Sequence, residues 1–143
     1  MPKAAIIYDT KGGSTGKVAI AIEEGLKESG VKVLSKRAST AKIEDVADAD
    51  VVILGSPTYQ GELTPSMKEF LSEMKNFDLK GKVGVAFGSV GWSGESIDEI
   101  NDSMEHILGM NVIKPGLKVI RNPSEYTLEK CKDFGKKIAE MIQ

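Results

Sequence analysis

The chain has 143 residues, of which 41% are hydrophobic and 28% charged, a composition ordinary for a globular domain. Nineteen basic and 21 acidic residues give a formal net charge of −2, which argues against nonspecific binding to nucleic acid. The one cysteine, Cys131, excludes an internal disulfide and a metal site with cysteine spacing. No signal peptide and no apolar run of roughly 18 residues is visible, so we expect one domain over residues 1–143 and a cytoplasmic setting.

Short apolar runs alternate with amphipathic segments along the whole chain. The first run, KAAIIY at 3–8, predicts a strand, and the segment at 14–29 predicts a helix with Val18, Ile22 and Leu26 on one face. The later elements follow in the same order: strand 31–37, short helix 43–47, strand 49–56, helix 64–76, strand 82–89, helix 94–109, strand 116–120 and helix 122–142.

This strict alternation predicts an α/β fold of the doubly wound type, with a five-stranded parallel sheet and helices on both faces. The runs at 3–8, 49–56 and 82–89 are continuously apolar, as expected of strands buried on both faces. The strands at 31–37 and 116–120 alternate more, which suits the edges. We start the last strand after Lys114-Pro115, because that dipeptide interrupts the apolar pattern.

Ligands of such sheets bind beyond the carboxyl ends of the strands, so the loops that follow the strands matter most. The first of them, DTKGGST at 9–15, combines two glycines that tolerate positive φ with three hydroxyl residues before a helix. Inward-facing N–H groups and the helix N-terminus would form a phosphate cradle. The alternative is a plain turn in which Ser14 or Thr15 only caps the helix. Neither a P-loop nor a G-x-G-x-x-G fingerprint is present.

The second loop, 56–62, and the third, 88–95, each carry one aromatic residue among small ones. Tyr59 and the only tryptophan, Trp92, follow buried strands, where core packing alone would not place them. Two rings at one rim predict a slot for a flat ring system; alternatively, Trp92 covers a helix end and Tyr59 lies on the surface. A slot beside a phosphate cradle fits flavin mononucleotide (FMN).

The motifs YDTKGGST, GSPTYQGELTPSM and FGSVGWSGE, in this order and each at a strand end, resemble those of the flavodoxin family over the full length of the chain. The likeness is greatest to the flavodoxin-like domain of flavodiiron proteins. It implies strand order 2-1-3-4-5, FMN as cofactor and a low-potential, one-electron carrier. Gly12 departs from the family, which has a hydroxyl or bulky residue there. No diiron domain is visible, so a free-standing carrier and an excised domain both remain open.

Carried over by position, the resemblance assigns the phosphate to the first loop and the flavin ring to the other two. The expected phosphate-binding residues are Thr10, Lys11, Gly12, Gly13, Ser14 and Thr15. Tyr59 and Trp92 are expected to flank the ring, while backbone groups of both loops bond its edges. The remaining expected contacts are Pro57, Thr58, Gln60, Gly61, Ser89, Val90, Gly91 and Gly94.

The implied function is electron transfer between protein partners, such as ferredoxin-like proteins or flavin and iron oxidoreductases, through a stabilised flavin semiquinone. A flexible peptide at Gly61 would favour that state. With Glu62 and Glu95 close and no Lys or Arg in either loop, full reduction should need a low potential. The alternative is an FMN-dependent NAD(P)H:quinone reductase, although no extra segment is present to build its second pocket.

Two reactive residue types are not assigned a role. We expect His106, the only histidine, to lie at or near the surface of the 94–109 helix. We expect Cys131, which lies within the last helix, to have a packing role and not to be a reactive thiol. Asp98, Glu99 and Asp102 form either an acidic docking rim or a plain solvated helix face.

Overall fold

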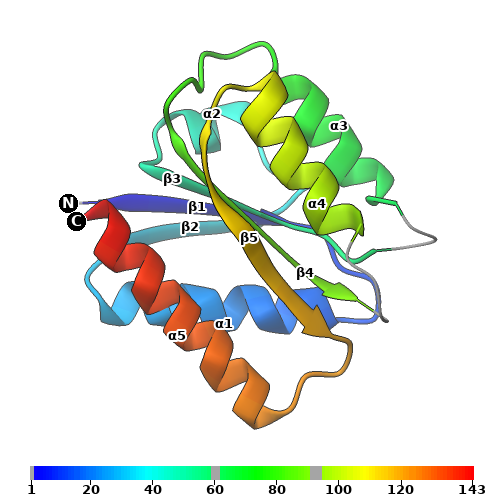
Figure 1. The fold of residues 1–143 in the computed structure, drawn as a ribbon, viewed down its shortest axis with the longest axis vertical. Coiled ribbons are helices and arrows are strands. Elements are labelled where there is room, and N and C mark those ends of the chain that lie inside the picture. Colours follow the sequence, from blue (N-terminus) through cyan, green and yellow to red (C-terminus); the bar gives the residue numbers. More distant parts are fainter. Residues whose placement is uncertain (1, 59–61, 91–94) are drawn as a thin grey trace.

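Five parallel strands form one sheet in the computed structural model, which describes residues 2–58, 62–90 and 95–143 (Figure 1). Along the sheet the order is β2-β1-β3-β4-β5, and every neighbouring pair is parallel. The strands are β1 (Lys3–Tyr8), β2 (Lys32–Arg37), β3 (Val51–Gly55), β4 (Val83–Val90) and β5 (Asn111–Ile120). The expected fold class and strand order are therefore confirmed.

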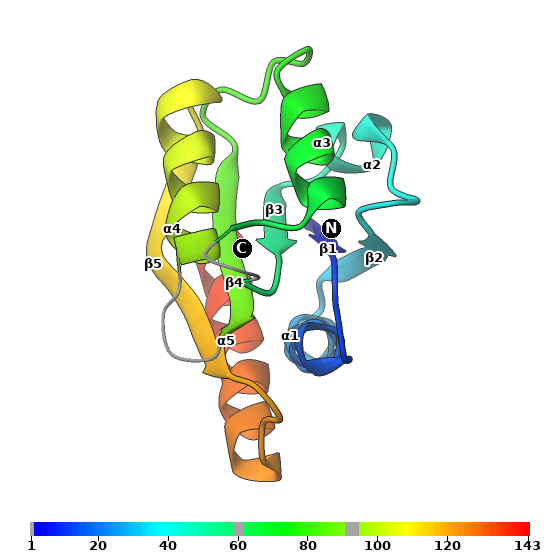
Figure 2. The ribbon, with the colours of Figure 1, turned by 90° about the vertical axis from the view of Figure 1, so that its right-hand side faces the viewer.

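Helices cover both faces of the sheet. Figure 1 shows α1 and α5 together on one side and α2, α3 and α4 on the other, and Figure 2 shows the same division after a quarter turn. None of the helices in the described part of the chain is long and apolar enough to cross a membrane. The helices are α1 (Ser14–Glu28), α2 (Ile43–Ala47), α3 (Pro65–Met74), α4 (Glu95–Asp102) with the π-helical turn η1 (Ser103–Ile107), and α5 (Glu125–Ile142).

The core consists of two apolar clusters, one on each face of the sheet. All five residues of β3 are buried, and its side chains alternate between the clusters. Val52 and Leu54 join the cluster beneath α2, α3 and α4, whereas Val51 and Ile53 join the one beneath α1 and α5. Each such buried side chain contributes about 1.5–3 kcal/mol of hydrophobic free energy. The central strands therefore anchor the sheet.

The structure differs from the sequence prediction at the last strand and the helix before it. β5 begins at Asn111, five residues earlier than predicted, and its pairing with β4 shifts register between Val85 and Phe87. An edge strand tolerates Pro115, because a proline without an N–H loses nothing on the side facing solvent. The helix predicted at 94–109 changes to π-helical geometry at Ser103 and ends at Ile107.

Helices α1 and α5 cross at two glycines. A Cβ atom on Gly25 would overlap the backbone of Lys132, and one on Gly135 would overlap the backbone of Ile22. Both glycines are buried in the contact. The two helix backbones therefore touch directly, which holds α5 against the start of the chain.

We predict opposite effects for two glycine-to-alanine changes in α1. Gly25→Ala should lower the free energy of unfolding by at least about 2 kcal/mol, because backbone atoms must move. Gly16→Ala should raise it by about 0.5–1 kcal/mol, since its Cβ would meet nothing closer than 3.8 Å. Urea denaturation of the apoprotein measures both. Similar effects of the two substitutions would contradict the close crossing.

Candidate functional site

Backbone hydrogen bonds bring the ends of β1, β3 and β4 to one edge of the sheet. The amide of Asp9 donates to the carbonyl of Gly55 at 3.0 Å. The amide of Ser56 donates to the carbonyl of Phe87 at 3.2 Å, and that of Thr58 donates to the carbonyl of Ser89 at 3.3 Å. The starts of all three predicted loops therefore lie side by side.

The first loop has the backbone geometry of an anion site. Gly12 and Gly13 have φ angles of 71° and 91°, and Gly13 is the N-cap of α1. Added Cβ atoms on either glycine would meet nothing within 4 Å, so the loop is open on that side. Because the first N–H groups of a helix have no partner inside it, α1 offers donors and its positive dipole end here.

The hydroxyl groups of Ser14 and Thr15 bond to other elements and do not cap α1. Ser14 Oγ accepts a hydrogen bond from the amide of Asn122 at 3.0 Å, which leaves the Ser14 proton to be donated elsewhere. Thr15 Oγ1 is buried and lies 2.7 Å from Ser89 Oγ. Thr10 Oγ1 accepts from the amide of Gly16 at 3.4 Å. These bonds tie the loop to β4, to the end of β5 and to itself.

A chain of hydroxyls joins the second loop to α4. Ser96 Oγ lies 3.5 Å from the carbonyl of Ser56, which can only accept, so Ser96 is the donor there. Thr58 Oγ1, 2.6 Å from Ser96 Oγ, then donates to Ser96 and accepts from the Ser96 amide at 3.4 Å. The one proton of the Thr58 hydroxyl is thereby donated inside the protein. Thr58 fixes the loop by its side chain.

The other expected contacts fall into three groups. Pro57, Ser89 and Val90 are buried, and Val90 lies within β4, where its carbonyl accepts the amide of Arg121 at 3.0 Å. Lys11 is exposed. Six of the expected contacts, including the aromatic pair, lie outside the described residues: Tyr59, Gln60, Gly61, Gly91, Trp92 and Gly94.

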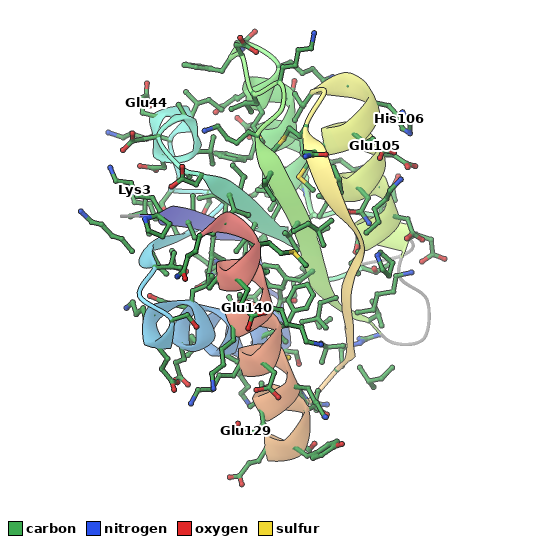
Figure 3. The ribbon with its side chains drawn as sticks, turned by 60° about the vertical axis from the view of Figure 1, so that its left-hand side comes forward. Lys3, Glu44, Glu105, His106, Glu129 and Glu140 are labelled. Carbon is green, nitrogen blue, oxygen red and sulfur yellow. The ribbon has the colours of Figure 1, made fainter. Side chains whose placement is uncertain are left out.

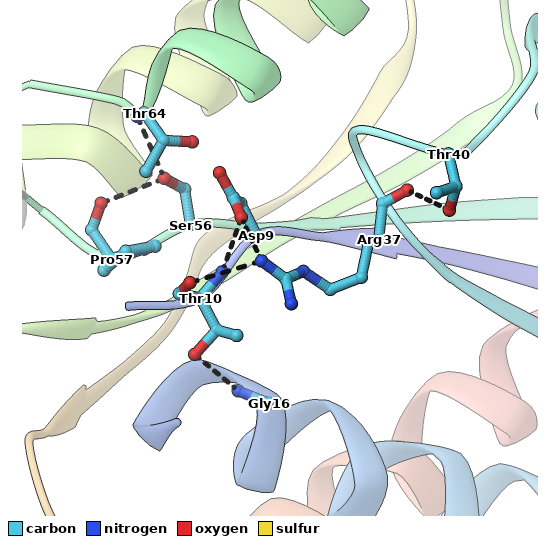
Figure 4. Close-up of polar contacts among 8 residues, drawn as sticks. All are labelled: Asp9, Thr10, Gly16, Arg37, Thr40, Ser56, Pro57 and Thr64. Atoms are coloured by element: carbon cyan, nitrogen blue, oxygen red, sulfur yellow. Dashed lines mark hydrogen bonds and ion pairs between the residues drawn. The ribbon is translucent and has the colours of Figure 1, made fainter. Parts of the chain in front are cut away.

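A polar network that the sequence did not predict lies behind the first loop (Figure 4). Arg37, the last residue of β2, donates from Nη2 to Asp9 Oδ1 at 2.9 Å and to the carbonyl of Thr10 at 3.4 Å. The Thr10 amide donates to the same Asp9 oxygen at 2.8 Å. Asn122 was missed as well. Both Arg37 and Asn122 could have been found by inspecting the carboxyl ends of the edge strands too.

Asp9 is an almost buried carboxylate whose charge is stabilised. Burial raises the pKa of Asp9, but interactions with the Thr64 hydroxyl, with Arg37 and with the Thr10 amide outweigh it and hold the pKa below its usual value. The Thr64 hydroxyl is buried and acts as a nearby dipole, since it lies outside the geometry of a full hydrogen bond. We therefore expect Asp9 to be ionised at neutral pH.

The acidic residues near the rim are partly paired. Glu62 lies 3.4 Å from Lys68 of α3, and Asp98 lies 3.3 Å from Lys118 of β5. The two loops themselves contain no cation, as the sequence analysis noted, but the fold supplies cations from neighbouring elements. Because these pairs are exposed, each contributes little to stability. The two lysines partly neutralise the negative charge of Glu62 and Asp98.

His106 and Cys131 lie away from this edge of the sheet. The His106 side chain is 70% exposed and lies beside Glu105 on η1, where Figure 3 shows both residues at the outer surface. Cys131 is buried in α5, and burial raises the pKa of its thiol to about 11. The expected positions of both residues are confirmed.

The fold and this edge define the class of doubly wound α/β proteins that bind a phosphate-bearing ligand beyond the strand ends. A family model described as flavodoxin matches residues 6–135, and the chain belongs to the flavodoxin family. FMN is the cofactor of that family. The residues present fit its phosphate: two positive-φ glycines, the free N–H groups of α1 and the Ser14 hydroxyl face an open loop.

Comparison with individual proteins gives the same family in two different contexts. A solved archaeal flavodoxin is 33% identical, with a TM-score of 0.92 and 98% coverage of both chains. Rubredoxin oxygen:oxidoreductase from Desulfovibrio gigas is 29% identical with a TM-score of 0.90, over 98% of this chain and 36% of that one. Type A flavoprotein fprA of Rhodobacter capsulatus is 34% identical over 142 residues, 96% of this chain and 32% of that protein. The chain spans about a third of the length of the first curated relatives it matches.

The buried hydroxyl pair predicts a non-additive effect on stability. Ser89→Ala should lower the free energy of unfolding of the apoprotein by about 1–3 kcal/mol, because it leaves the buried Thr15 hydroxyl without its partner. Adding Thr15→Val should recover part of that loss, since no polar group is then stranded. Chemical denaturation measures the cycle; strictly additive losses would show that the two hydroxyls do not depend on each other.

The lowered pKa of Asp9 predicts an acid-dependent contribution to stability. A folded pKa below the unfolded value of about 3.9 stabilises the protein above that pH, and this stabilisation disappears as the pH falls through the folded pKa. Unfolding measured from pH 7 to pH 2.5 should therefore show a gap between the wild type and Asp9→Asn that narrows below about pH 4. Asp48→Asn, at an exposed ion pair with Lys3, is the control and should show a smaller gap. A pH-independent gap for Asp9→Asn would contradict this assignment.

Proposed function

We propose that this protein is a low-potential electron carrier that binds FMN non-covalently and transfers single electrons between redox partners. The first loop is the observation that carries this proposal. Its two positive-φ glycines open α1 toward solvent, and Asn122 orients the Ser14 hydroxyl so that it can donate a hydrogen bond. A dianionic phosphate monoester matches these donors without a metal ion.

Different residues of the chain bind the phosphate and the flavin ring. The 11–15 backbone with the hydroxyls of Thr10, Ser14 and Thr15 binds the phosphate. Tyr59 and Trp92 flank the ring, and the backbones of 57–61 and 89–94 bond its edges. When bound, FMN supplies the redox chemistry, taking up one electron at a time.

The first and second loops are fixed at their bases. Thr58 and Ser96 join the second loop to α4, and Thr15 and Ser89 join the first loop to β4. Rigid bases of this kind support a preorganised site, because little conformational entropy is then lost when the cofactor binds. These two hydroxyl contacts therefore support the proposal that FMN binds at this edge of the sheet.

The charges around the edge support a low potential. Glu62 is the last residue of the second loop, and Asp98 and Glu99 lie on α4 after the third loop. These acidic residues disfavour additional negative charge on a reduced cofactor. Lys68 and Lys118 soften this effect through the exposed ion pairs described above. We therefore propose a full-reduction potential below that of free FMN, by less than the sequence alone suggested.

We propose other redox proteins as partners, either ferredoxin-like proteins or flavin and iron oxidoreductases. One structural relative is named rubredoxin oxygen:oxidoreductase, and this chain covers 36% of its longer chain. An electron carrier that works as a separate chain and one that works as part of a longer protein would use the same edge of the sheet. The cytoplasmic setting stays a prediction of the sequence.

Purified protein tests this function directly. Apoprotein mixed with FMN should develop a structured visible spectrum and quench the flavin fluorescence, and it should bind riboflavin more weakly, since riboflavin lacks the phosphate. Anaerobic stepwise reduction should pass through a half-reduced form with its own absorbance bands. Absence of FMN binding would overturn the proposal. Rapid NAD(P)H oxidation without a half-reduced form would instead favour a quinone reductase.

A further inference from the structure

An ion pair between the nearly buried Asp9 and the exposed Arg37 lies directly behind the proposed phosphate loop. The side chain of Asp9 is 12% exposed and that of Arg37 46%, with 2.9 Å between Arg37 Nη2 and Asp9 Oδ1. The two residues come from different elements, because Asp9 follows β1 and Arg37 ends β2 (Figure 4). Arg37 also reaches the carbonyl of Thr10, the first residue of the loop, at 3.4 Å.

Asp9 has two effects on the loop, and they oppose each other. Its carboxylate accepts the Thr10 amide at 2.8 Å and so fixes Thr10, whose own Oγ1 accepts the Gly16 amide at 3.4 Å at the start of α1. Its negative charge, however, lies one residue from a site for a phosphate monoester, which carries between one and two negative charges at neutral pH. Uncompensated, this charge would repel the ligand.

Arg37 removes that conflict. Its guanidinium neutralises the carboxylate while leaving the bond from Thr10 in place. We propose that Asp9 and Arg37 form a charge-balanced positioning pair that sets the preference of the site for the phosphorylated flavin over riboflavin. This inference rests on the proposed function, because it assumes that the first loop binds the phosphate of FMN.

The electrostatic and the purely structural roles of the pair predict different results. Removing the cation exposes the carboxylate, and removing the carboxylate exposes the cation, so the two changes should shift phosphate recognition in opposite directions. If the pair had only a structural role, either change would weaken the binding of FMN and of riboflavin by a similar factor. The useful quantity is therefore the ratio of the dissociation constant of riboflavin to that of FMN.

The experiment compares apoprotein variants by flavin fluorescence quenching at low ionic strength. Relative to the wild type, Arg37→Gln should lower the ratio roughly tenfold, as expected for one charge acting on a nearby dianion at a protein surface. Asp9→Asn, which keeps an oxygen for the Thr10 amide, should raise the ratio several-fold. The double variant should return it to near the wild-type value. Added salt should shrink all of these differences.

A second ion pair of the same kind is the control. Lys36, the neighbour of Arg37 on β2, pairs with Asp45 of α2 at 3.1 Å, with exposures of 36% and 16%. The Asp45 carboxylate also accepts a backbone amide, that of Lys42, as Asp9 accepts that of Thr10. Lys36→Gln and Asp45→Asn change the net charge by the same amounts as Arg37→Gln and Asp9→Asn. Because the Lys36–Asp45 pair joins β2 to α2 and not to the first loop, the ratio of dissociation constants should stay constant in these two variants.

The outcomes separate this inference from the function on which it rests. A wild-type protein that binds riboflavin as tightly as FMN would contradict the proposed phosphate site. A wild type that prefers FMN, with single variants that shift the ratio in the same direction or no further than the controls, would overturn the pair's role alone. Thermal unfolding of each apoprotein checks that it is folded. If Asp9→Asn does not fold, the comparison of Arg37→Gln with Lys36→Gln decides.

Discussion

The amide hydrogen bonds that join the ends of β1, β3 and β4 are the constraint on which the rest of this structure depends. They run from Asp9 to Gly55 and from Ser56 to Phe87, where strand pairing gives way to loops. Because parallel strands end at the same edge, these bonds bring together residues that are 46 and 31 positions apart in the sequence. The edge at which the three predicted loops begin is thus set by the sheet.

This edge lies on top of an apolar core, and apart from the Thr64 hydroxyl its buried polar side chains are hydrogen-bonded. Thr15, Ser89 and Ser96 are buried, and each of them hydrogen-bonds to another element. A buried hydroxyl without a partner costs about 1–3 kcal/mol, so such pairs fix the relative positions of the elements they join. The same hydroxyls that support the loops thereby determine which donors remain for a ligand. Ser14 keeps a proton to donate, whereas Thr58 does not.

Much of the fold could be predicted from local pattern. Continuous apolar runs located β1, β3 and β4, and helical spacing of apolar residues located α1, α3 and α5, because burial on a sheet face or a helix stripe leaves a periodic signal. The start of β5 could not be predicted, since Lys114-Pro115 reads as a break and only the edge position makes it acceptable. The π-helical end of α4 leaves no comparable signal in the sequence.

The sequence by itself determined the fold class, the three loops and the chemistry of the first one, because glycines and hydroxyls after a buried strand are a local pattern. Only the tertiary structure showed that Arg37 neutralises Asp9, that Asn122 orients Ser14 and that Lys68 pairs with Glu62. Each of these contacts joins residues from different elements, and in two of them the partners are 28 and 108 residues apart. Charge and hydrogen-bond direction at the site depend on distance in space, and that distance is set by the packing of the sheet.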